Sequence, residues 1–283
     1  MNQISKTKIN VILPKKSFFQ LDLKEYWRYR DLLSLFIQRE IVVKYKQTIL
    51  GPLWYFIQPL LQTLMFTVVF GNIAGISTDG VPRILFYLAG VTAWNYFAES
   101  LKLTSDSFIK NFQLYNKIYF PRAIIPMSIV FSNVLKFLIQ FLLFLGVYFY
   151  YFMSETNLQP NLTILLIPIY ILITAGLALG FGLLISALTT KYRDLNFLIQ
   201  FGIQLWMYAT PIIYPISKIS TNNQIYVLAN PMTSIVEAFK YAFLGVGMFS
   251  INGLLYSFGF MCIILMLGFL LFNGMEKNFV DTA

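Results

Sequence analysis

Residues 162–189 read LTILLIPIYILITAGLALGFGLLISALT, and this stretch decides the class of fold. It contains no charged residue and is longer than the roughly 20 helical residues that cross a bilayer core of about 30 Å. Backbone groups inside such a core must find their hydrogen-bond partners within the segment, as they do in an α-helix. The stretch therefore predicts a membrane-spanning helix.

Other apolar stretches of similar length surround it. They lie near residues 53–75, 84–104, 124–152, 196–214 and 251–273. The composition agrees, because 58% of the 283 residues are hydrophobic and only 12% are charged. A soluble domain carries about 25% charged residues. We expect an all-α integral membrane protein whose transmembrane domain, residues 51–283, has six transmembrane helices.

Two segments before this domain differ from it. Residues 1–17 form a polar tail, which we expect in the cytoplasm. Residues 18–50 carry many charges among bulky apolar residues at helical spacing. This pattern predicts an amphipathic helix in the membrane interface, with Trp27 and Tyr29 at headgroup depth. The alternative is a helix packed on another soluble domain.

Two segments between the expected spans stand out. Residues 105–122 form a polar inner loop, and residues 215–250 form an outer region. Within the outer region, residues 231–247 are apolar but contain Glu237 and Lys240. We expect a short outer re-entrant helix there, because irregular backbone at membrane depth needs protein or water around it.

The basic residues predict the topology. The chain has 21 Lys and Arg against 12 Asp and Glu, a net charge of +9. With the N-terminus inside, the outer segments hold only Arg83, Lys218 and Lys240, while Lys136 falls within a span. The other basic residues are then cytoplasmic, which places both termini in the cytoplasm. This bias accounts for the net charge, so we expect no nucleic-acid partner.

The sequence offers little for covalent chemistry. It has no histidine, and Cys262 is its single cysteine, so we expect no metal site and no intrachain disulfide. It has no phosphate-binding G-x-x-x-x-G-K-[ST] motif and no carboxylate pair at membrane depth. We expect a chain that is not an enzyme and binds no cofactor, whose transport is driven by another protein.

One expected span carries a polar stripe. Ser128, Ser132, Lys136 and Gln140 recur every four residues. The stripe is either a lining or coupling surface, or a structural feature in which Lys136 reaches the inner interface or pairs with Glu99. We favour the structural interpretation.

Small residues cluster within residues 162–189. Gly176 and Gly180 are four residues apart, and Ala178, Gly182 and Ser186 share a second face. Such spacing lets helix backbones approach closely. We favour tight packing within one subunit over a dimer face.

Aromatic residues make up 18% of the chain and occur in groups around Trp54, Trp94 and Trp206. Most are typical of the anchors that membrane proteins place at both interfaces. Aromatic rings also stack on sugar rings, so a pore for a sugar chain is the alternative.

Three stretches combine charged and aromatic residues in a characteristic order. The first comprises residues 29–33 (YRDLL), 39–41 (REI), 44–48 (KYKQT), 50–54 (LGPLW) and 58–59 (QP). The second is residues 116–122 (NKIYFPR). The third comprises residues 191–194 (KYRD), 204–211 (QLWMYATP), 214–215 (YP) and 230–232 (NPM). Together they resemble the permease subunits of ABC-type polysaccharide exporters, which move O-antigen, capsule or teichoic-acid chains.

This resemblance implies a homodimer of six-helix permeases in the bacterial inner membrane. Two separate ATPase subunits would bind ATP and Mg, and the substrate would be a lipid-linked polysaccharide. The basic interface helix would attract the pyrophosphate of that substrate or hold anionic membrane lipid; we favour the second.

The resemblance also implies roles for three groups of residues. The channel lining would include Trp54, Tyr55, Trp94, Tyr96, Trp206 and Tyr208. Coupling to the ATPase would involve Arg39, Asn116, Lys117, Phe120, Arg122, Arg193 and Asp194. The outer gate would include Pro211, Tyr214, Pro215, Asn230, Pro231 and Met232.

Two other functions are compatible with parts of this pattern. An ABC-type permease for a drug, a lipid or a small glycolipid would have the same fold with a different cargo. A membrane-embedded transferase is disfavoured by the missing histidine and by the lack of a D-x-D metal motif or a paired acidic site.

Overall fold

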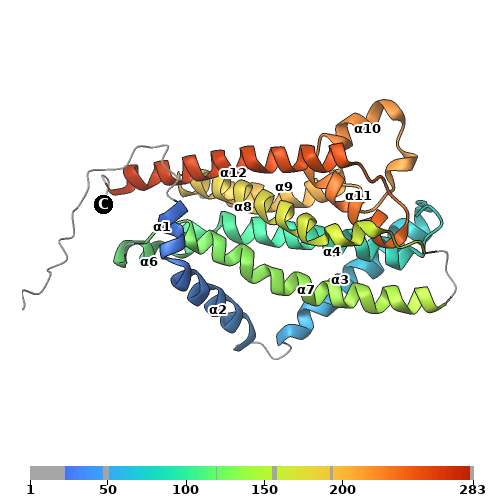
Figure 1. The fold of residues 1–283 in the computed structure, drawn as a ribbon, viewed down its shortest axis with the longest axis horizontal. Coiled ribbons are helices and arrows are strands. Elements are labelled where there is room, and N and C mark those ends of the chain that lie inside the picture. The colour runs from blue at the N-terminus through green and yellow to red at the C-terminus, as the bar shows by residue number, and fades with distance from the viewer. Residues whose placement is uncertain (1–22, 47–50, 119, 155–157, 192–193, 281–283) are drawn as a thin grey trace, which may run out of the picture.

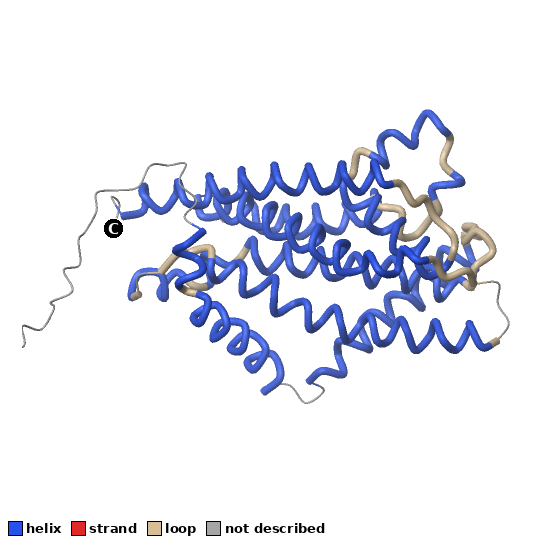
Figure 2. The backbone as a smooth tube through the Cα atoms, in the orientation of Figure 1, coloured by secondary structure: helices blue, strands red, loops and turns tan. Residues whose placement is uncertain are grey.

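The computed structural model describes residues 23–46, 51–118, 120–154, 158–191 and 194–280. Within these ranges the chain is helical and forms no strand (Figure 2). The elements in chain order are α1 (Leu23–Arg28), α2 (Arg30–Lys46), η1 (Gly51–Leu53), α3 (Trp54–Phe66), η2 (Thr67–Ile73), α4 (Arg83–Ser105), α5 (Ser107–Lys110), α6 (Phe112–Lys117), α7 (Ile124–Met153), η3 (Leu162–Leu166), α8 (Ile167–Lys191), α9 (Leu195–Ala209), η4 (Ile216–Lys218), α10 (Thr221–Leu228), α11 (Pro231–Leu244) and α12 (Ile251–Val280). The prediction of an all-α fold is confirmed.

The long helices run lengthwise and form an elongated bundle (Figure 1). Helices α4, α7, α8, α9 and α12 lie along its long axis, and α3 crosses them obliquely. The loops gather at the two ends of the bundle (Figure 2). Helices α1 and α6 lie at the end where α12 finishes, and α10 and α11 lie at the other end (Figure 1).

Four segments of the described chain are long and apolar enough to cross a membrane. They are Trp54–Ile73, Ile124–Met153, Leu162–Thr189 and Ile251–Gly274, which match four of the expected spans. The two remaining stretches form α4 and α9. Helix α4 is less apolar because it includes Arg83, Glu99 and Lys102, and α9 has only 15 residues. The chain is thus an integral membrane protein, and the count of six spans stays a prediction.

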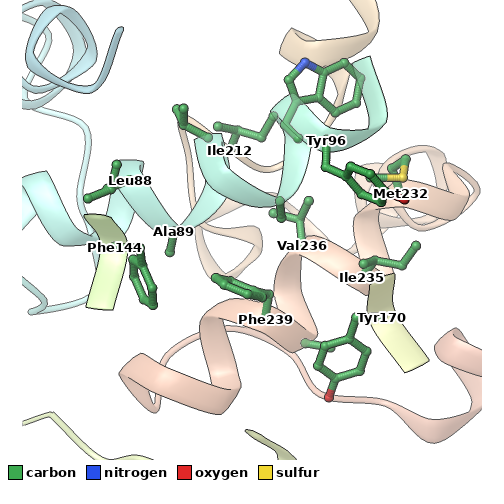
Figure 3. Close-up of a cluster of buried hydrophobic side chains, with 14 of the residues drawn as sticks. Leu88, Ala89, Tyr96, Phe144, Tyr170, Ile212, Met232, Ile235, Val236 and Phe239 are labelled. Atoms are coloured by element: carbon green, nitrogen blue, oxygen red, sulfur yellow. The ribbon is translucent and has the colours of Figure 1, made fainter. Parts of the chain in front are cut away.

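Helix α4 lies at the centre of the core. It packs against α3, α7, α8, α9 and α11, and Leu85, Tyr87 and Phe97 on it are completely buried. Figure 3 shows how Leu88 and Ala89 lie among side chains of neighbouring elements. This central position explains why α4 tolerates several polar residues, since protein surrounds much of its surface.

The small residues of α8 let it approach two neighbours of the same chain. A Cβ atom on Gly180 would lie 2.8 Å from the backbone nitrogen of Leu265 in α12, and one on Gly182 would lie 2.5 Å from Thr104 Cβ in α4. A Cβ atom on Gly176 would overlap Met261. The prediction of tight packing within one subunit is confirmed, because all three contacts are made inside this chain.

Replacing Gly180 with alanine is therefore expected to destabilise the chain by about 1–3 kcal/mol, the usual cost of overpacking. The added methyl group meets α12 backbone, which cannot move aside as a side-chain end can. The measurement is the midpoint of SDS-induced unfolding of the purified chain. Gly146→Ala is the matched control, because a Cβ atom on Gly146 in α7 would meet no neighbouring element within 4 Å. Equal midpoints for the two variants would contradict this account.

The predicted helix over 18–50 differs in detail from the described part of that segment. Residues from 23 onward form two helices, α1 and α2, which are separated at Tyr29. Part of their apolar surface packs on the protein, since Tyr26, Leu33 and Phe36 join a buried cluster. The location of these helices in a membrane interface stays a prediction, and the tail of residues 1–17 lies outside the described residues.

The expected outer helix is α11, which begins at Pro231 and ends at Leu244. Its 14 residues give a length of about 21 Å, shorter than a bilayer core of about 30 Å. Almost all of its side chains are buried within the chain. Its re-entrant position in a membrane stays a prediction.

Candidate functional site

At the end of the bundle where α12 finishes (Figure 1), aromatic rings join the 105–122 loop to α2 and α12. We call the group of Phe36, Phe108, Tyr115, Phe120 and Phe272 the coupling corner. Phe120 packs against Phe36 of α2, with ring centroids 5.7 Å apart. On the other side, Phe108 meets Phe272 of α12 at 6.0 Å. The loop is thus wedged between α2 and α12, next to the start of α7.

Two rings in this corner stack and carry a cation. Phe108 and Tyr115 are nearly parallel, with centroids 5.3 Å apart, and the Arg122 guanidinium lies 5.6 and 5.8 Å from their centroids. The Tyr115 hydroxyl donates a hydrogen bond of 3.1 Å to the Arg122 carbonyl. Burial raises the pKa of Tyr115 above its usual range and outweighs the opposing charge of Arg122. The hydroxyl therefore keeps its proton and remains a donor.

A second group of contacts orders the same loop. Lys110 forms an ion pair of 2.8 Å with Asp106 one turn earlier. Arg39 of α2 donates a long hydrogen bond of 3.4 Å to Asn111, and its guanidinium also lies over the Phe36 ring. Helix α2 and the loop are consequently held together by both apolar and polar contacts.

The structure brings together some of the predicted coupling residues. Arg39 and Phe120 both contact Phe36, and Phe120 and Arg122 both contact Tyr115. Asn116 and Lys117 are exposed on α6. Asp194 is exposed at the start of α9, well apart in sequence from the corner. Arg193 lies outside the described residues. The coupling role of the whole set stays a prediction.

At the opposite end of the bundle, the Asn230 side chain links two helices. Its Oδ1 accepts hydrogen bonds from Trp206 Nε1 in α9 and from the Met232 backbone N–H, both at 3.0 Å. Its Nδ2 donates to Thr210 Oγ1 at 2.8 Å. Asn230 is the N-cap of α11, and Pro231 follows at a position where its missing N–H costs nothing. One amide thus begins α11 and fixes its start against the end of α9.

Replacing Asn230 with alanine is expected to lower stability through two losses. The missing cap costs about 1 kcal/mol, and the Trp206 N–H, left without an acceptor in a partly buried place, costs about 1–3 kcal/mol more. The measurement is the thermal midpoint of the purified protein together with its tryptophan emission. Asn222→Ala is the control, because Asn222 is exposed on α10. A midpoint shift no larger than that of the control would refute the linking role.

A buried ion pair lies further along α11. Glu237 and Lys240 are 3.7 Å apart and almost fully buried, with side chains 2% and 0% exposed. The Lys240 ammonium donates to the carbonyl of Pro211 and lies 3.7 Å from the centroid of the Phe86 ring. Glu237 Oε2 accepts a hydrogen bond from the Met248 backbone at 3.0 Å. This pair, which the sequence presents as an interruption of an apolar stretch, joins α11 to α4 and to the turn after α9. In the sequence, the signal for this ion pair is the i,i+3 spacing of Glu237 and Lys240, which places both side chains on one face of a helix.

The remaining residues of the predicted outer gate surround these contacts. Pro211, Pro215 and Met232 are buried, and Tyr214 is half-buried. Nearby, Ser217 donates to the Asp79 carboxylate at 2.8 Å, which ties the segment before α10 to the loop before α4. The structure therefore assembles all of the predicted gate residues at one end of the bundle. Their action as a gate stays a prediction.

The aromatic residues predicted to line a channel divide into two groups. Trp94 and Tyr96 are buried in the core of the single chain. Trp206 is half-buried and packs edge-on against Phe97 and Phe181, at 5.0 Å from each. In this conformation these three rings hold helices together. Trp54 and Tyr208, in contrast, are 49% and 44% exposed.

Tyr55 belongs to a small charged group near the start of α3. Lys136 of α7 pairs with Glu99 of α4 at 3.5 Å, and its ammonium lies 5.1 Å from the centroid of the Tyr55 ring. Of the two structural alternatives for Lys136, the pairing with Glu99 is the one observed. The group links three helices, which favours the structural interpretation of the polar stripe.

The coupling corner and the Asn230 link have one feature in common, which is that each joins separate helices. In the part of the chain that is described, histidine, cysteine, aspartate and glutamate form no group that can hold a metal ion. The coupling corner and the Asn230 link instead join separate helices, so that displacement of one helix shifts its neighbours. Such contacts can transmit a conformational change from one end of the bundle to the other.

Comparison with known proteins gives consistent similarities. Residues 31–244 match the family model described as ABC-2 type transporter. An O-antigen export system permease protein RfbA from Klebsiella pneumoniae is 30% identical over 253 residues, which cover 89% of this chain and 94% of the relative. A second protein of that name and organism is 28% identical over the same shares. One from Myxococcus xanthus is 27% identical over 224 residues, 78% of this chain and 83% of the relative.

Proposed function

We propose a function from one established premise: the chain belongs to the ABC-2 type transporter family. Within that family we infer that it is the transmembrane permease subunit of an ATP-driven exporter, which moves a lipid-linked polysaccharide across the bacterial inner membrane. The observation that carries this proposal is the similarity to O-antigen export permeases over nearly the whole length of both chains. Membership of the family implies a separate ATPase partner.

The proposed assembly is a homodimer with two ATPase subunits and six spans in each permease. The spans are the four long apolar segments together with α4 and α9. Both termini are cytoplasmic in this arrangement, which puts the coupling corner on the inner side and α10 and α11 on the outer side. The distribution of basic residues supports this orientation.

The proposed mechanism begins at the coupling corner. ATP binding draws the two ATPases together, and they push on the exposed residues Asn116 and Lys117 of α6. The movement passes through Phe120 to α2 and through Phe108 to α12. At the outer end, the Asn230 link carries the displacement of α9 to α11. A channel then opens between the two permeases, with Trp54 and Tyr208 available to contact the sugar chain.

Co-expression with the ATPase encoded nearest to this chain's gene tests the proposal. We expect a stable complex whose ATP hydrolysis in nanodiscs rises when the lipid-linked polysaccharide of the host is added. An ATPase with a mutated Walker motif is the control and should remove the hydrolysis. Failure of any ATPase to associate would contradict the exporter proposal, and stimulation only by a drug or a simple lipid would contradict the cargo.

A further inference from the structure

A cavity of about 200 Å³ opens between α10, α11 and the start of α12. Its walls are mainly apolar and include Ile216, Leu228 and Met248. Gly253 lets α12 pack closely on α11 at one wall, since a Cβ atom there would lie 2.7 Å from Ser234 Oγ. An apolar cavity of about 150 Å³ is already large enough for benzene. The cavity can therefore hold a short stretch of hydrocarbon.

The polar groups of its walls are mostly partnered within the chain. Thr233 Oγ1 donates to the Val227 carbonyl at 2.7 Å, and the Tyr256 hydroxyl donates to the Ala229 carbonyl at 2.7 Å. Ser250 Oγ accepts from the Gly253 N–H at 3.2 Å. Glu237 is paired with Lys240. Among the lining residues that the structure describes, Ser234 alone offers a hydroxyl without such a bond. Glu237 Oε1 has no hydrogen bond and faces the Lys240 ammonium at 3.7 Å. These two groups do not satisfy a sugar ring.

The mouth of the cavity continues into the surface of a membrane helix. Tyr256 of α12 lines the cavity and is itself 43% exposed. Ile263 and Leu267, two and three turns further along the same face of α12, are also exposed, and α12 is one of the four candidate spans. On the other side of the mouth, Ile225 and Tyr226 of α10 are also exposed. In Figure 1, α10 stands out from the end of the bundle beside α12.

From these observations we propose that the cavity seats an aliphatic chain of a bilayer lipid. This face of α12 lies in the hydrocarbon of the membrane and leads a chain upward to the cavity. There the chain fills the space beneath α10 and supports the packing of α10 on α11. The proposed topology decides only which leaflet supplies the lipid, and with α10 and α11 on the outer side it is the outer leaflet.

Photolabelling of the full chain tests this binding without any measurement of transport. The chain is reconstituted in nanodiscs of phosphatidylethanolamine and phosphatidylglycerol that contain a phospholipid with a diazirine on the last carbon of one acyl chain. That carbon normally lies near the bilayer centre, so it labels Met266 and its neighbours. We expect additional adducts on Glu237, Met248 and Tyr256, because the seated chain carries the terminal carbon into the cavity.

Two variants that fill the cavity, Ser234→Leu and Leu228→Trp, are expected to reduce the cavity adducts at least tenfold and to leave those near Met266 unchanged. Ser220→Leu is the matched control, since Ser220 is exposed just before α10. Adducts near Met266 without any in the cavity would overturn the proposal, as expected if a sugar or a second copy of the chain occupied it. Cavity adducts that persist in both filled variants would overturn it as well. Because labelling needs neither ATPase nor substrate, its failure is distinct from failure of the exporter proposal.

Discussion

Replacing Lys240 with methionine is expected to destabilise the folded chain by about 3–5 kcal/mol, the usual cost of leaving one member of a buried ion pair without its partner. In the variant, the Glu237 carboxylate stays almost fully buried with no cation beside it. The Pro211 carbonyl also loses the ammonium that donates to it. Methionine fills a similar volume, so the loss is electrostatic rather than a packing defect.

The local backbone makes escape of Glu237 difficult. Helix α11 ends at Gly245, whose φ of 71° is left-handed, and Gly247 has a φ of 111°. These two glycines turn the chain back, so that the Met248 N–H donates to Glu237 Oε2. The carboxylate is thus held through Oε2 by the backbone that follows α11. We expect the variant to lose the fixed position of α11 before the long helices separate.

The measurement is SDS-induced unfolding of the purified chain, followed by circular dichroism and by limited proteolysis after residue 244. Lys218→Met is the matched control, because Lys218 is an exposed lysine of the same region. The double variant Lys240→Met/Glu237→Gln should regain most of the stability, since it removes the lone charge and keeps an acceptor for Met248. If Lys240→Met unfolds at the same SDS concentration as Lys218→Met, the ion pair does not hold α11 in place.

Features that depend on one segment or on close spacing are predictable from the sequence. The long apolar runs predict four of the helices that can span a membrane, because length and hydropathy are enough for that purpose. The spacing of Gly176 and Gly180 predicts close helix packing. Opposite charges within two spans indicate the pairing of Glu99 with Lys136 as one of two structural arrangements, since an unpaired charge at that depth is costly.

Features that depend on which face of a helix is covered are not predictable in this way. Composition and resemblance assign Trp94 and Tyr96 to a channel, but their burial depends on the neighbours that surround α4. The motif around Asn230 indicates the gate region, yet the bonds of this side chain to Trp206 and Thr210 arise from segments about 20 residues away. Helix α10 has no counterpart among the predicted elements, because its eight residues are too few for a clear periodic signal.

Replacing Phe120 with alanine is expected to separate ATP hydrolysis from transport. Phe120 is almost fully buried between Phe36 of α2 and Tyr115 of the loop. Removing a buried phenylalanine side chain costs about 3–5 kcal/mol, and here the loss falls on the contact that joins the loop to α2. The long helices do not share this contact, so we expect the chain to insert and to bind its ATPase. Basal hydrolysis should persist, while stimulation by substrate and export of the polysaccharide should fall at least tenfold.

A double-mutant cycle shows whether this effect is local. Phe36→Ala removes the partner ring, and the two substitutions together should cost less than the sum of their separate effects, by about 0.5–1.5 kcal/mol for an aromatic pair. Phe149→Ala is the matched control, because Phe149 is exposed on α7, far along the helix from the corner. Phe120→Leu should restore part of the coupling, since it refills much of the space. If Phe120→Ala instead abolishes assembly with the ATPase, the ring serves folding of the loop. If it leaves export at the level of Phe149→Ala, the force passes through the polar contact of Arg39 with Asn111 and not through the rings.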